Sequence, residues 1–318
     1  IELLGIGSYE KEIRERIVKR DDYFFKNIVL VDEETKERTS TTVVIYSSYW
    51  NEHNLPPGFI AKRKSKLTKG QQLKFIYGHP FGKNGGEYYP NFQRWKFVKK
   101  LEYNPKLAIH TAWDFNAVPY VTCLLAHVEY VTRYWDEAGQ MKYEEGRPGT
   151  RPMTVLRFRF FKEYCIEDGT TEGTANQFVE DFGDNNPDVF VNGDASGRSR
   201  IEGLGALTQY KIIENKWTDK LYLADGWLRT KKVNIQNSKR RDLMNRIWEG
   251  KCPEVEIEID EKCVKLIKDC EYLLKGVDGG KHKEKVKDAN GLKYEELGHP
   301  SDAMEYLVCD LCQDFLKE

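Results

Sequence analysis

The sequence predicts a mixed α/β domain, in which a sheet of parallel and antiparallel strands is flanked by helices. Short apolar or alternating runs, such as residues 107–116 and 189–194, have the length and period of strands. Residues 170–182, between these runs, carry apolar side chains at helical spacing, which favours a helix packed on the sheet. A long alternating segment adds a projecting β-hairpin, and the residues before 105 form an N-terminal appendage.

The N-terminal appendage, residues 1–104, has the least regular pattern. Residues 1–19 predict a charged helix, and Ile28 to Asp32 is expected to pair with Thr42 to Tyr46 across a polar turn. The basic stretch Lys62 to Lys69 is more typical of a solvated helix face than of a DNA contact. A glycine-containing linker follows it.

The main domain, residues 105–318, opens with its first strand and the projecting hairpin. The first strand ends in a turn at Asn116 to Pro119, and Tyr120 to Tyr134 forms the outgoing arm of the hairpin. The hairpin tip is expected at residues 136–140. Its return ends before a third strand, which is predicted over Thr154 to Tyr164.

The second half of the main domain alternates helices with strands. A crossover helix over Thr170 to Phe182 predicts that the strand ending at Asp194 runs parallel to the first strand. Residues 254–260 alternate as an outer strand, and Asp260 is expected to cap the following helix. The inward face of that helix is predicted to be apolar, and it consists of Cys263, Leu266, Ile267, Cys270 and Leu274. The lysine-rich residues 276–298 predict a mobile loop beside the site.

Length, charge and cysteine content narrow the class of protein. A chain of 318 residues is long enough for one domain and a substantial appendage. Its 50 basic and 51 acidic residues nearly cancel, so any affinity for DNA must come from local patches. The sequence has no bilayer-spanning apolar stretch and no signal-like start, and its seven cysteines lack framework spacing. We therefore expect a soluble intracellular protein with reduced thiols and no membrane contact. Ile1 in place of Met suggests a fragment or a processed product.

Three short patterns imitate well-known motifs, and each has a simpler interpretation. Residues 29–33 resemble a Walker B strand, but a hairpin strand is favoured because no G-x-x-x-x-G-K-[ST] sequence occurs anywhere. Residues 78–83 imitate a phosphate loop, but no Ser or Thr follows Lys83, so a turn-rich linker is expected. Cys309 and Cys312 form C-x-x-C on an amphipathic helix, which favours ordinary thiols over zinc ligands. The chain is therefore not expected to hydrolyse ATP on its own.

Three aspartates occupy positions where a carboxylate is costly unless a positive charge binds it. Asp114 ends an alternating run, Asp194 ends an apolar run, and Asp302 opens an apolar helix. Two strand ends and a helix start can converge, and converging acids stay ionised mainly when they share divalent cations. A site built of Asp favours Mg²⁺ or Mn²⁺. Repulsion between the acids also predicts that replacing one of them by Asn stabilises the metal-free protein. Each acid alone would be an ordinary turn or helix residue.

The segments around these acids resemble a known family. Trp113 to Asn116 with Pro119, Asn192 to Gly197 and His299 to Leu307 are similar, in this order, to three acidic motifs of large terminase subunits. These proteins are the DNA-packaging motors of tailed phages and their herpesvirus relatives, and the motifs belong to their nuclease domain. The order of the acids is also that of ribonuclease H-like nucleases, so the resemblance implies a ribonuclease H-like sheet from about Pro105 to the C-terminus.

Two upstream segments extend the resemblance into the appendage. Thr42 to Pro56 and Gly85 to Phe92 are similar to the segment that closes a terminase ATPase domain and leads to its nuclease. The resemblance therefore implies that residues 1–104 are the tail of an ATPase domain and its linker.

The activity implied by the resemblance is that of a metal-dependent endonuclease, which cuts concatemeric viral double-stranded DNA during genome packaging. Hydrolysis would use two Mg²⁺ or Mn²⁺ ions about 3.5–4 Å apart, with Asp114 bridging them and Asp194 and Asp302 completing one side each. The implied partners are double-stranded DNA, the portal protein and the small terminase subunit, in the host cell cytoplasm. The alternatives are a Holliday-junction resolvase, a transposase-like nuclease, or a noncatalytic DNA-gripping module of a packaging motor.

Residues near the acids have two interpretations each. His299 ligates metal or orients water, or else it only flanks its helix. Glu163 is an additional acid or, as the favoured interpretation, a solvent-facing strand residue. Ser196 and Arg198 contact the scissile phosphate or form a surface turn. A candidate DNA track, whose alternative is a solvated helix face, consists of Lys231, Lys232, Lys239, Arg240 and Arg241.

Overall fold

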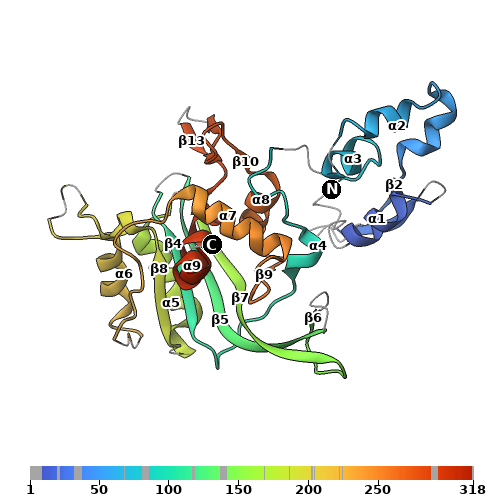
Figure 1. Ribbon diagram of the computed structural model, residues 1–318. Helices are drawn as coiled ribbons and strands as arrows, with labels where there is room; N and C mark the ends of the chain where they lie inside the picture. The colour runs from blue at the N-terminus through green and yellow to red at the C-terminus, as the bar shows by residue number, and fades with distance from the viewer. Residues whose placement is uncertain are drawn as a thin grey trace. The chain divides into compact units, whose positions relative to one another are not determined.

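The computed structural model divides the chain into two compact units, residues 1–96 and 97–318 (Figure 1). It describes residues 9–19, 22–31, 38–67, 69–80, 86–116, 119–136, 142–167, 169–185, 187–201, 203, 205–221, 223, 225–287 and 293–316. The second unit begins before residue 105, where the sequence suggested a boundary, because Leu101 and Tyr103 already pack against its core.

The first unit contains one helix packed on a β-hairpin. Helix α1 (Glu10–Ile17) buries Ile13 and Ile17 against Phe24. The predicted charged helix is therefore confirmed over these residues, while residues 1–8 lie outside the described ranges. The remaining helices are short and comprise η3 (Ser48–Asn54), α2 (Phe59–Lys64), α3 (Lys69–Phe75) and, at the boundary, α4 (Arg94–Phe97).

The hairpin of the first unit pairs strand β1 (Phe24–Val31) with strand β2 (Arg38–Ile45). The predicted hairpin is confirmed, but its register is wrong: Phe24 lies opposite Ile45, and Ile28 lies opposite Thr41. The ladder starts at Phe24 because the side chain of Phe24 is part of the buried cluster against α1. Asp32 of the Walker B-like run and Lys83 of the phosphate-loop-like run lie outside the described residues.

A mixed sheet of seven strands forms the centre of the second unit. Its strands are β3 (Val98–Lys99), β4 (Ile109–Asp114), β5 (Tyr120–Asp136), β6 (Lys142–Tyr143), β7 (Thr150–Glu167), β8 (Val189–Gly193) and β9 (Val255–Asp260). The order across the sheet is β3-β9-β7-β5-β4-β8, and β6 pairs with β5. β5 is antiparallel to both β4 and β7, whereas β8 is parallel to β4 and β9 is parallel to β7. The predicted mixed α/β sheet is confirmed, and its strand order is consistent with a ribonuclease H-like fold.

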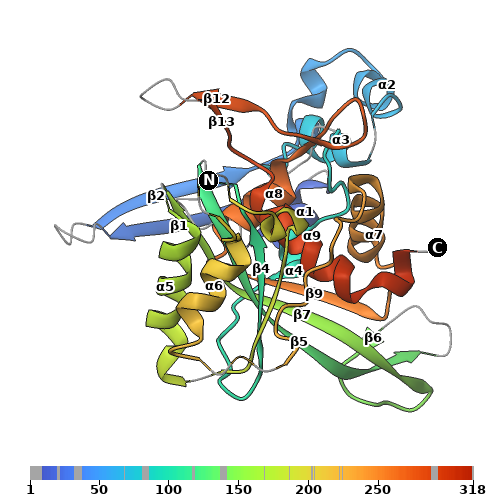
Figure 2. The ribbon, with the colours of Figure 1, turned by 90° about the vertical axis from the view of Figure 1, so that its left-hand side faces the viewer.

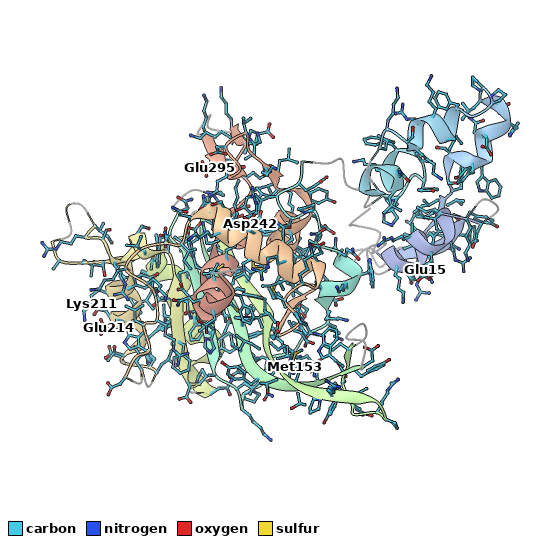
Figure 3. The ribbon with its side chains drawn as sticks, in the orientation of Figure 1. Glu15, Met153, Lys211, Glu214, Asp242 and Glu295 are labelled. Atoms are coloured by element: carbon cyan, nitrogen blue, oxygen red, sulfur yellow. The ribbon has the colours of Figure 1, made fainter. Side chains whose placement is uncertain are left out.

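The projecting hairpin is formed by β5 and β7, which pair from Tyr120–Glu167 to Asp136–Thr150. One register shift, between Leu125 and Ala126, bends the ladder. The return arm and the third strand, which the sequence separated, are one continuous strand. Pro152 does not interrupt β7, because it lies outside the part of the strand, Leu156 to Phe160, that also pairs with β9. The neighbouring Met153 is labelled in Figure 3. Residues 137–140 of the expected tip lie outside the described residues.

Helices cover both faces of the sheet (Figure 2). On one face, α5 (Thr171–Phe182) and α6 (Gln209–Trp217) bury Trp113, Phe178 and Trp217 against β4 and β8. The predicted crossover helix is confirmed, and the Thr170 hydroxyl caps it by accepting the Gly173 N–H. The other face carries α7 (Asn237–Glu249), α8 (Val264–Tyr272) and α9 (His299–Leu311).

Two small hairpins lie between α8 and α9, within the segment predicted as a loop. They pair β10 (Leu274–Lys275) with β11 (Lys281–His282), and β12 (Lys285–Lys287) with β13 (Lys293–Glu295). Short 3-10 turns complete the unit and comprise η4 (Gly183–Asn185), η5 (Ala195–Arg198) and η6 (Gln313–Leu316). No helix within the described ranges is long and apolar enough to cross a membrane. The seven cysteines are free thiols, and Cys309 and Cys312 are buried.

The N-terminus of α8 is capped by a residue that the sequence assigned elsewhere. The Glu163 carboxylate accepts the N–H groups of Lys265 and Leu266 at 2.8 and 2.9 Å, so Glu163 is not solvent-facing. Asp260, the predicted cap, instead accepts the N–H groups of Leu101 and Lys262. The predicted inward face of α8 is confirmed except at its end, where Leu273 is buried and Leu274 is exposed.

A glycine substitution tests the close approach of β8 to β4. Gly193 has a φ of +151°, and a Cβ there would lie against the Trp113 backbone. We expect Gly193→Ala to lower the free energy of unfolding by about 2–4 kcal/mol, measured by urea denaturation. Gly250→Ala is the matched control, because its φ of +86° is also positive but open space surrounds it. The control should lose about 1 kcal/mol, and equal losses in the two variants would contradict the close approach.

Candidate active site

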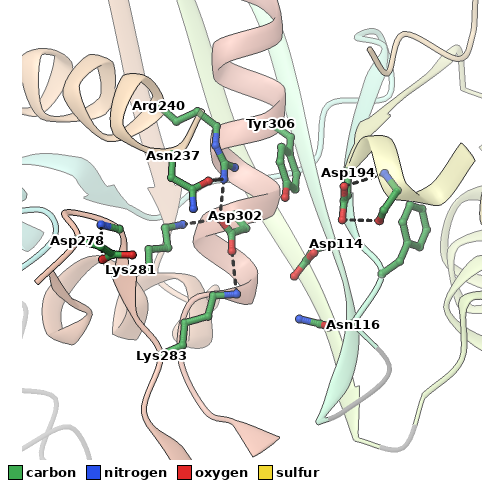
Figure 4. A pocket seen from close by; sticks show the side chains of 13 residues that line it. Asp114, Asn116, Asp194, Asn237, Arg240, Asp278, Lys281, Lys283, Asp302 and Tyr306 are labelled. Carbon is green, nitrogen blue, oxygen red and sulfur yellow. Dashed lines mark hydrogen bonds and ion pairs between the residues drawn. The ribbon is translucent and has the colours of Figure 1, made fainter. Parts of the chain in front are cut away.

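The three aspartates predicted from the sequence line one pocket. Asp114 is the last residue of β4, Asp194 directly follows β8, and Asp302 lies in the first turn of α9. Because β4 and β8 are parallel neighbours, their carboxyl ends meet at the same edge of the sheet, and α9 brings Asp302 across that edge. The pocket has a volume of about 370 Å³ and is strongly polar. Figure 4 shows the side chains that line it. Its other lining residues are Phe115, Asn116, Ser196, Asn237, Arg240, Asp278, Gly280, Lys281, Lys283 and Tyr306.

Asp194 is half-buried and is held by neutral donors. Its Oδ1 accepts the Ser196 N–H at 2.8 Å and the Asn234 side-chain amide at 2.6 Å, and its Oδ2 accepts the Ser196 hydroxyl. The Asp194 N–H donates to the Trp113 carbonyl, which ties the turn after β8 to β4. No ion pair joins Asp194 to a lysine or arginine in the part of the chain that the structure describes, so its charge is supported only by dipoles.

Asp114 is buried beside a histidine. Its Oδ2 lies 2.9 Å from His299 Nδ1, and the same nitrogen lies 2.8 Å from the Asn116 amide. Burial raises the pKa of Asp114, the hydrogen bond to His299 opposes this rise, and the charge of Asp302 adds to it. The charge of Asp114 is therefore poorly compensated by the protein.

His299 positions Asp114 and is not one of the residues that line the pocket. Its Nε2 lies 3.1 Å from the Glu295 carbonyl. Its Nδ1 faces Asp114 and Asn116. With both ring nitrogens engaged, the ring holds the Asp114 carboxylate in place, and it offers no open nitrogen to a metal ion in this arrangement.

Asp302 has the opposite environment, because three cations surround it. Its Oδ1 lies 2.9 Å from Lys281 Nζ and 3.2 Å from Arg240, and its Oδ2 lies 3.0 Å from Lys283 Nζ. Burial opposes ionisation of Asp302, but Lys281, Lys283 and Arg240 outweigh it and hold the pKa of this carboxyl well below its usual range. Asp302 is therefore firmly ionised without any bound metal.

A second acid, Glu305, completes this buried charge cluster one turn further along α9. Glu305 Oε2 lies 3.2 Å from Lys281 Nζ and 3.3 Å from Arg240. The side chains of Lys281 and Arg240 are only 2 % and 3 % exposed, so both cations are committed to the two acids. Sequence reasoning missed Lys281, Lys283 and Glu305. The one sequence feature that pointed to these lysines was the high lysine content of residues 276–298, which predicted a segment beside the site.

The start of α9 is fixed by a buried carboxylate from α8. Asp269 accepts the Gly298 N–H through Oδ1 and the Ser301 N–H through Oδ2, both at 3.0 Å. These are two of the N–H groups that a helix leaves unpaired at its N-terminus. Burial raises the pKa of Asp269, and the two backbone hydrogen bonds oppose that rise. This cap sets the position of Asp302 relative to the sheet.

The candidate DNA track divides into exposed and buried residues. Lys232 and Lys239 are exposed, and Lys231 is partly buried. The assignment of Arg240 to the DNA track is wrong, because its side chain is buried against Asp302 and Glu305 and cannot lie on a surface track. The helical spacing of the apolar residues could have indicated this burial, since Arg240 shares the buried face of α7 with Leu243, Met244 and Ile247.

Two further arginines have local partners. Arg241 donates to the Gly279 carbonyl and pairs with Asp242, and Arg198 donates to the Thr230 carbonyl. Arg198 belongs to the exposed turn after Asp194, and it is not among the residues that line the pocket.

The carboxylates fit a hard divalent cation in part. Among the described residues, no three His, Cys, Asp or Glu side chains are grouped closely enough to hold a metal ion. Asp302 does not fit, because both of its oxygens contact lysine or arginine. Asp114 and Asp194 fit, because Mg²⁺ commonly binds through one or two carboxylates and completes its shell with waters and substrate phosphate. Cys309 and Cys312 lie outside the pocket lining.

Comparison with solved structures finds the large terminase of a thermophilic bacteriophage. One crystal form aligns with a TM-score of 0.43 and 12% identity over 83% of this chain. The complex with ATP-gamma-S aligns with a TM-score of 0.41 and 13% identity over 80% of this chain. Both alignments cover 53% of the terminase, so this chain spans about half its length. No family model and no curated protein matches the sequence.

The two environments predict opposite effects of Asp→Asn substitutions on stability. The folded-state pKa of Asp114 is raised, so its ionisation costs stability above that pKa. Asp114→Asn should therefore stabilise the metal-free protein at pH 8, and this gain should vanish as the pH falls towards the unfolded-state pKa. Asp302→Asn should cost about 3–5 kcal/mol at pH 8, because it leaves buried cations without their partner.

The measurement is urea denaturation at pH 8 and at lower pH, with the exposed Asp219→Asn as a neutral control. The folded-state pKa of Asp302 is depressed, so its contribution is complete above the unfolded-state pKa and is lost only as the pH falls through the folded-state pKa. This result would replace the expectation that losing any of the three acids relieves repulsion. An Asp302→Asn variant as stable as the parent would refute the charge cluster.

Proposed function

We propose that this chain is a metal-dependent endonuclease that hydrolyses the phosphodiester bonds of double-stranded DNA. The observation that carries the proposal is the convergence of Asp114 and Asp194 in one polar pocket whose opposite wall carries Lys281 and Lys283. A carboxylate wall suits a divalent cation, and an ammonium wall suits a phosphate group. A pocket with both walls therefore matches the charges of a metal-bound phosphodiester.

Phosphodiester hydrolysis places two electrostatic demands on this pocket. Water must lose a proton as it attacks phosphorus, and the departing ester oxygen gains negative charge. A divalent cation bound by Asp114 and Asp194 would lower the pKa of a bound water. His299 keeps the Asp114 carboxylate oriented through the 2.9 Å contact with Nδ1. The Lys283 ammonium, the more exposed of the two lysines, would provide positive charge where the phosphate and the departing oxygen would lie.

A more specific part of the proposal is a role in genome packaging, which rests on the order and the residues of the three acidic motifs. In that role the chain cuts concatemeric viral DNA, and residues 1–96 belong to the tail of a motor ATPase domain. The portal protein and the small terminase subunit would be its partners, in the cytoplasm of the host cell. A noncatalytic DNA-gripping module would instead bind DNA without cutting it.

Plasmid nicking tests the proposed activity. The purified chain should convert supercoiled plasmid to the nicked form with Mn²⁺ or Mg²⁺, and chelation should stop the reaction. Asp114→Asn and Asp194→Asn should each lower the rate by at least about 10²-fold, because each removes a charged ligand of the same site. Asp219→Asn, an exposed acid after α6, is the control and should nick like the parent. Metal-dependent nicking at the parental rate by Asp114→Asn would refute the site. Binding without any metal-dependent nicking would favour the gripping module.

DNA binding should depend strongly on salt and weakly on sequence. Replacing the exposed Lys232 and Lys239 together with Ala should reduce the slope of log affinity against log salt by roughly 1.8, at about 0.9 for each phosphate contact. Fluorescence anisotropy with a labelled duplex measures this slope. The matched control replaces Lys211 and Lys220, which are exposed in and just after α6 on the other face of the sheet. An unchanged slope in the Lys232 and Lys239 variant would remove both residues from the DNA track.

A further inference from the structure

We propose that the pocket binds a single divalent cation, at Asp114 and Asp194, and that the Lys283 ammonium takes the place of a second ion. The inference rests on the proposed nuclease function and deepens it, because it assigns Lys283 a contact with the phosphate and makes Asp302 a positioning residue. It departs from the two-ion site that the motif resemblance implies.

The first argument is that Asp302 has no oxygen to give to a metal ion. Lys281 and Arg240 contact its Oδ1, and Lys283 contacts its Oδ2 at 3.0 Å. Lys281 is bound in addition by the Ser301 hydroxyl at 2.9 Å and by Glu305. Moving Lys281 aside would leave a buried ammonium without its partners, which is strongly unfavourable. Asp302 therefore stays paired with lysine when a metal ion occupies the pocket.

The second argument is charge balance. The buried acids Asp302 and Glu305 are matched by the buried cations Lys281 and Arg240, and Lys283 adds a further positive charge next to Asp302. A divalent ion at Asp302 would therefore meet a carboxylate whose charge three cations already compensate. Asp114 and Asp194 together carry two negative charges, and neither is paired with a lysine or arginine in the described ranges. Their sum matches one divalent ion.

The third argument distinguishes Lys283 from the other two cations. Its side chain is 22 % exposed, compared with 2 % for Lys281 and 3 % for Arg240. Lys283 is therefore the cation that can donate to a phosphate oxygen while it keeps its contact with Asp302, because an ammonium group has three donors. Its second acidic neighbour, Glu295, is further away at 3.4 Å.

The fold also reserves space for the stem of Lys283. The stem crosses the start of α9 at Gly298, where a Cβ would lie 2.8 Å from Lys283 Cε. Gly298 also has a φ of +112°, a conformation that glycine adopts readily. Glycine at the N-cap of α9 thus lets the lysine reach Asp302 across the helix end. Burial would lower the pKa of Lys283, but the carboxylates of Asp302 and Asp114 outweigh it, so the amine stays charged.

The reaction balances without any further co-reactant. A water oxygen forms a bond to phosphorus, one phosphorus–ester oxygen bond breaks, and the bonding pair leaves on the ester oxygen. One proton of the water is released to solvent, and the departing oxygen takes up one proton. In this scheme Lys283 lies against the phosphate and stabilises the negative charge on the departing oxygen, while Asp302 holds the ammonium in position.

The first test is the number of Mn²⁺ ions that bind to the full chain, measured by calorimetry and by loss of the free-ion EPR signal. The parent should bind one Mn²⁺, and Asp114→Asn and Asp194→Asn should bind it at least about tenfold more weakly. Two ions in the parent, with the second lost in Asp302→Asn, would overturn the inference and leave the nuclease proposal standing. No Mn²⁺ binding at all would overturn both.

The second test replaces Lys283. Lys283→Met should bind Mn²⁺ with an affinity within about threefold of the parent, while its nicking kcat falls about 10²-fold at a concentration that saturates the parent. Lys283→Arg should recover most of this loss, because it restores the positive charge. Lys285→Met, which alters an exposed lysine of β12 outside the pocket lining, is the matched control and should behave like the parent. Parental kcat in Lys283→Met, or no recovery in Lys283→Arg, would overturn the role of Lys283.

Discussion

Burying a carboxylate requires a compensating donor or cation, and the second unit meets this requirement by joining elements that are distant in sequence. Glu163 of β7 caps α8, and Asp269 of α8 caps α9. Asp302 of α9 then binds Lys281 from β11 and Arg240 from α7. Each link fixes the next element, so this series of polar contacts sets the position of α9 over the sheet. Apolar packing alone would leave the rotation and register of α9 less well defined.

The sheet supplies the other half of the site through the parallel pairing of β4 and β8. Asp114 and Asp194 can meet only because the two strands end at the same edge. Gly193 lets the backbones approach at that edge, where the Asp194 N–H reaches the Trp113 carbonyl. The carboxylates therefore follow from the strand order, and the lysines follow from the helices above it. Two independent parts of the fold meet in one pocket.

Local periodicity made most of the fold predictable. The strands, the crossover helix and the long hairpin each show a periodic pattern of apolar residues that can be read from a short stretch of sequence. The parallel direction of β8 follows from the helix that connects it to the preceding strands. The convergence of Asp114, Asp194 and Asp302 was accessible for the same reason, since each lies at the end of a predicted element. The register of β1 and β2 was not accessible, because it depends on how Phe24 packs against α1.

The partners of the charged residues were the main part that the sequence could not supply. Lys281 and Lys283 lie in a polar segment whose residues look alike, and only the tertiary structure distinguishes the two that enter the pocket. Glu163 was assigned to solvent because its partners, Lys265 and Leu266, are about a hundred residues away. Arg240 was assigned to the surface because it belongs to a run of basic residues. A charge pattern in sequence does not reveal which charges the fold buries.

The three aspartates have the same side chain but three different electrostatic environments. Asp302 is surrounded by cations that keep its pKa low, Asp194 is held by an amide and a hydroxyl, and Asp114 is buried with its pKa raised. A bound cation stabilises a carboxylate most where the protein itself stabilises that charge least. Asp114 is therefore the residue at which a metal ion gains most, and Asp302 is the residue at which it gains least. Environments of this kind can give neighbouring carboxylates separate tasks in one site.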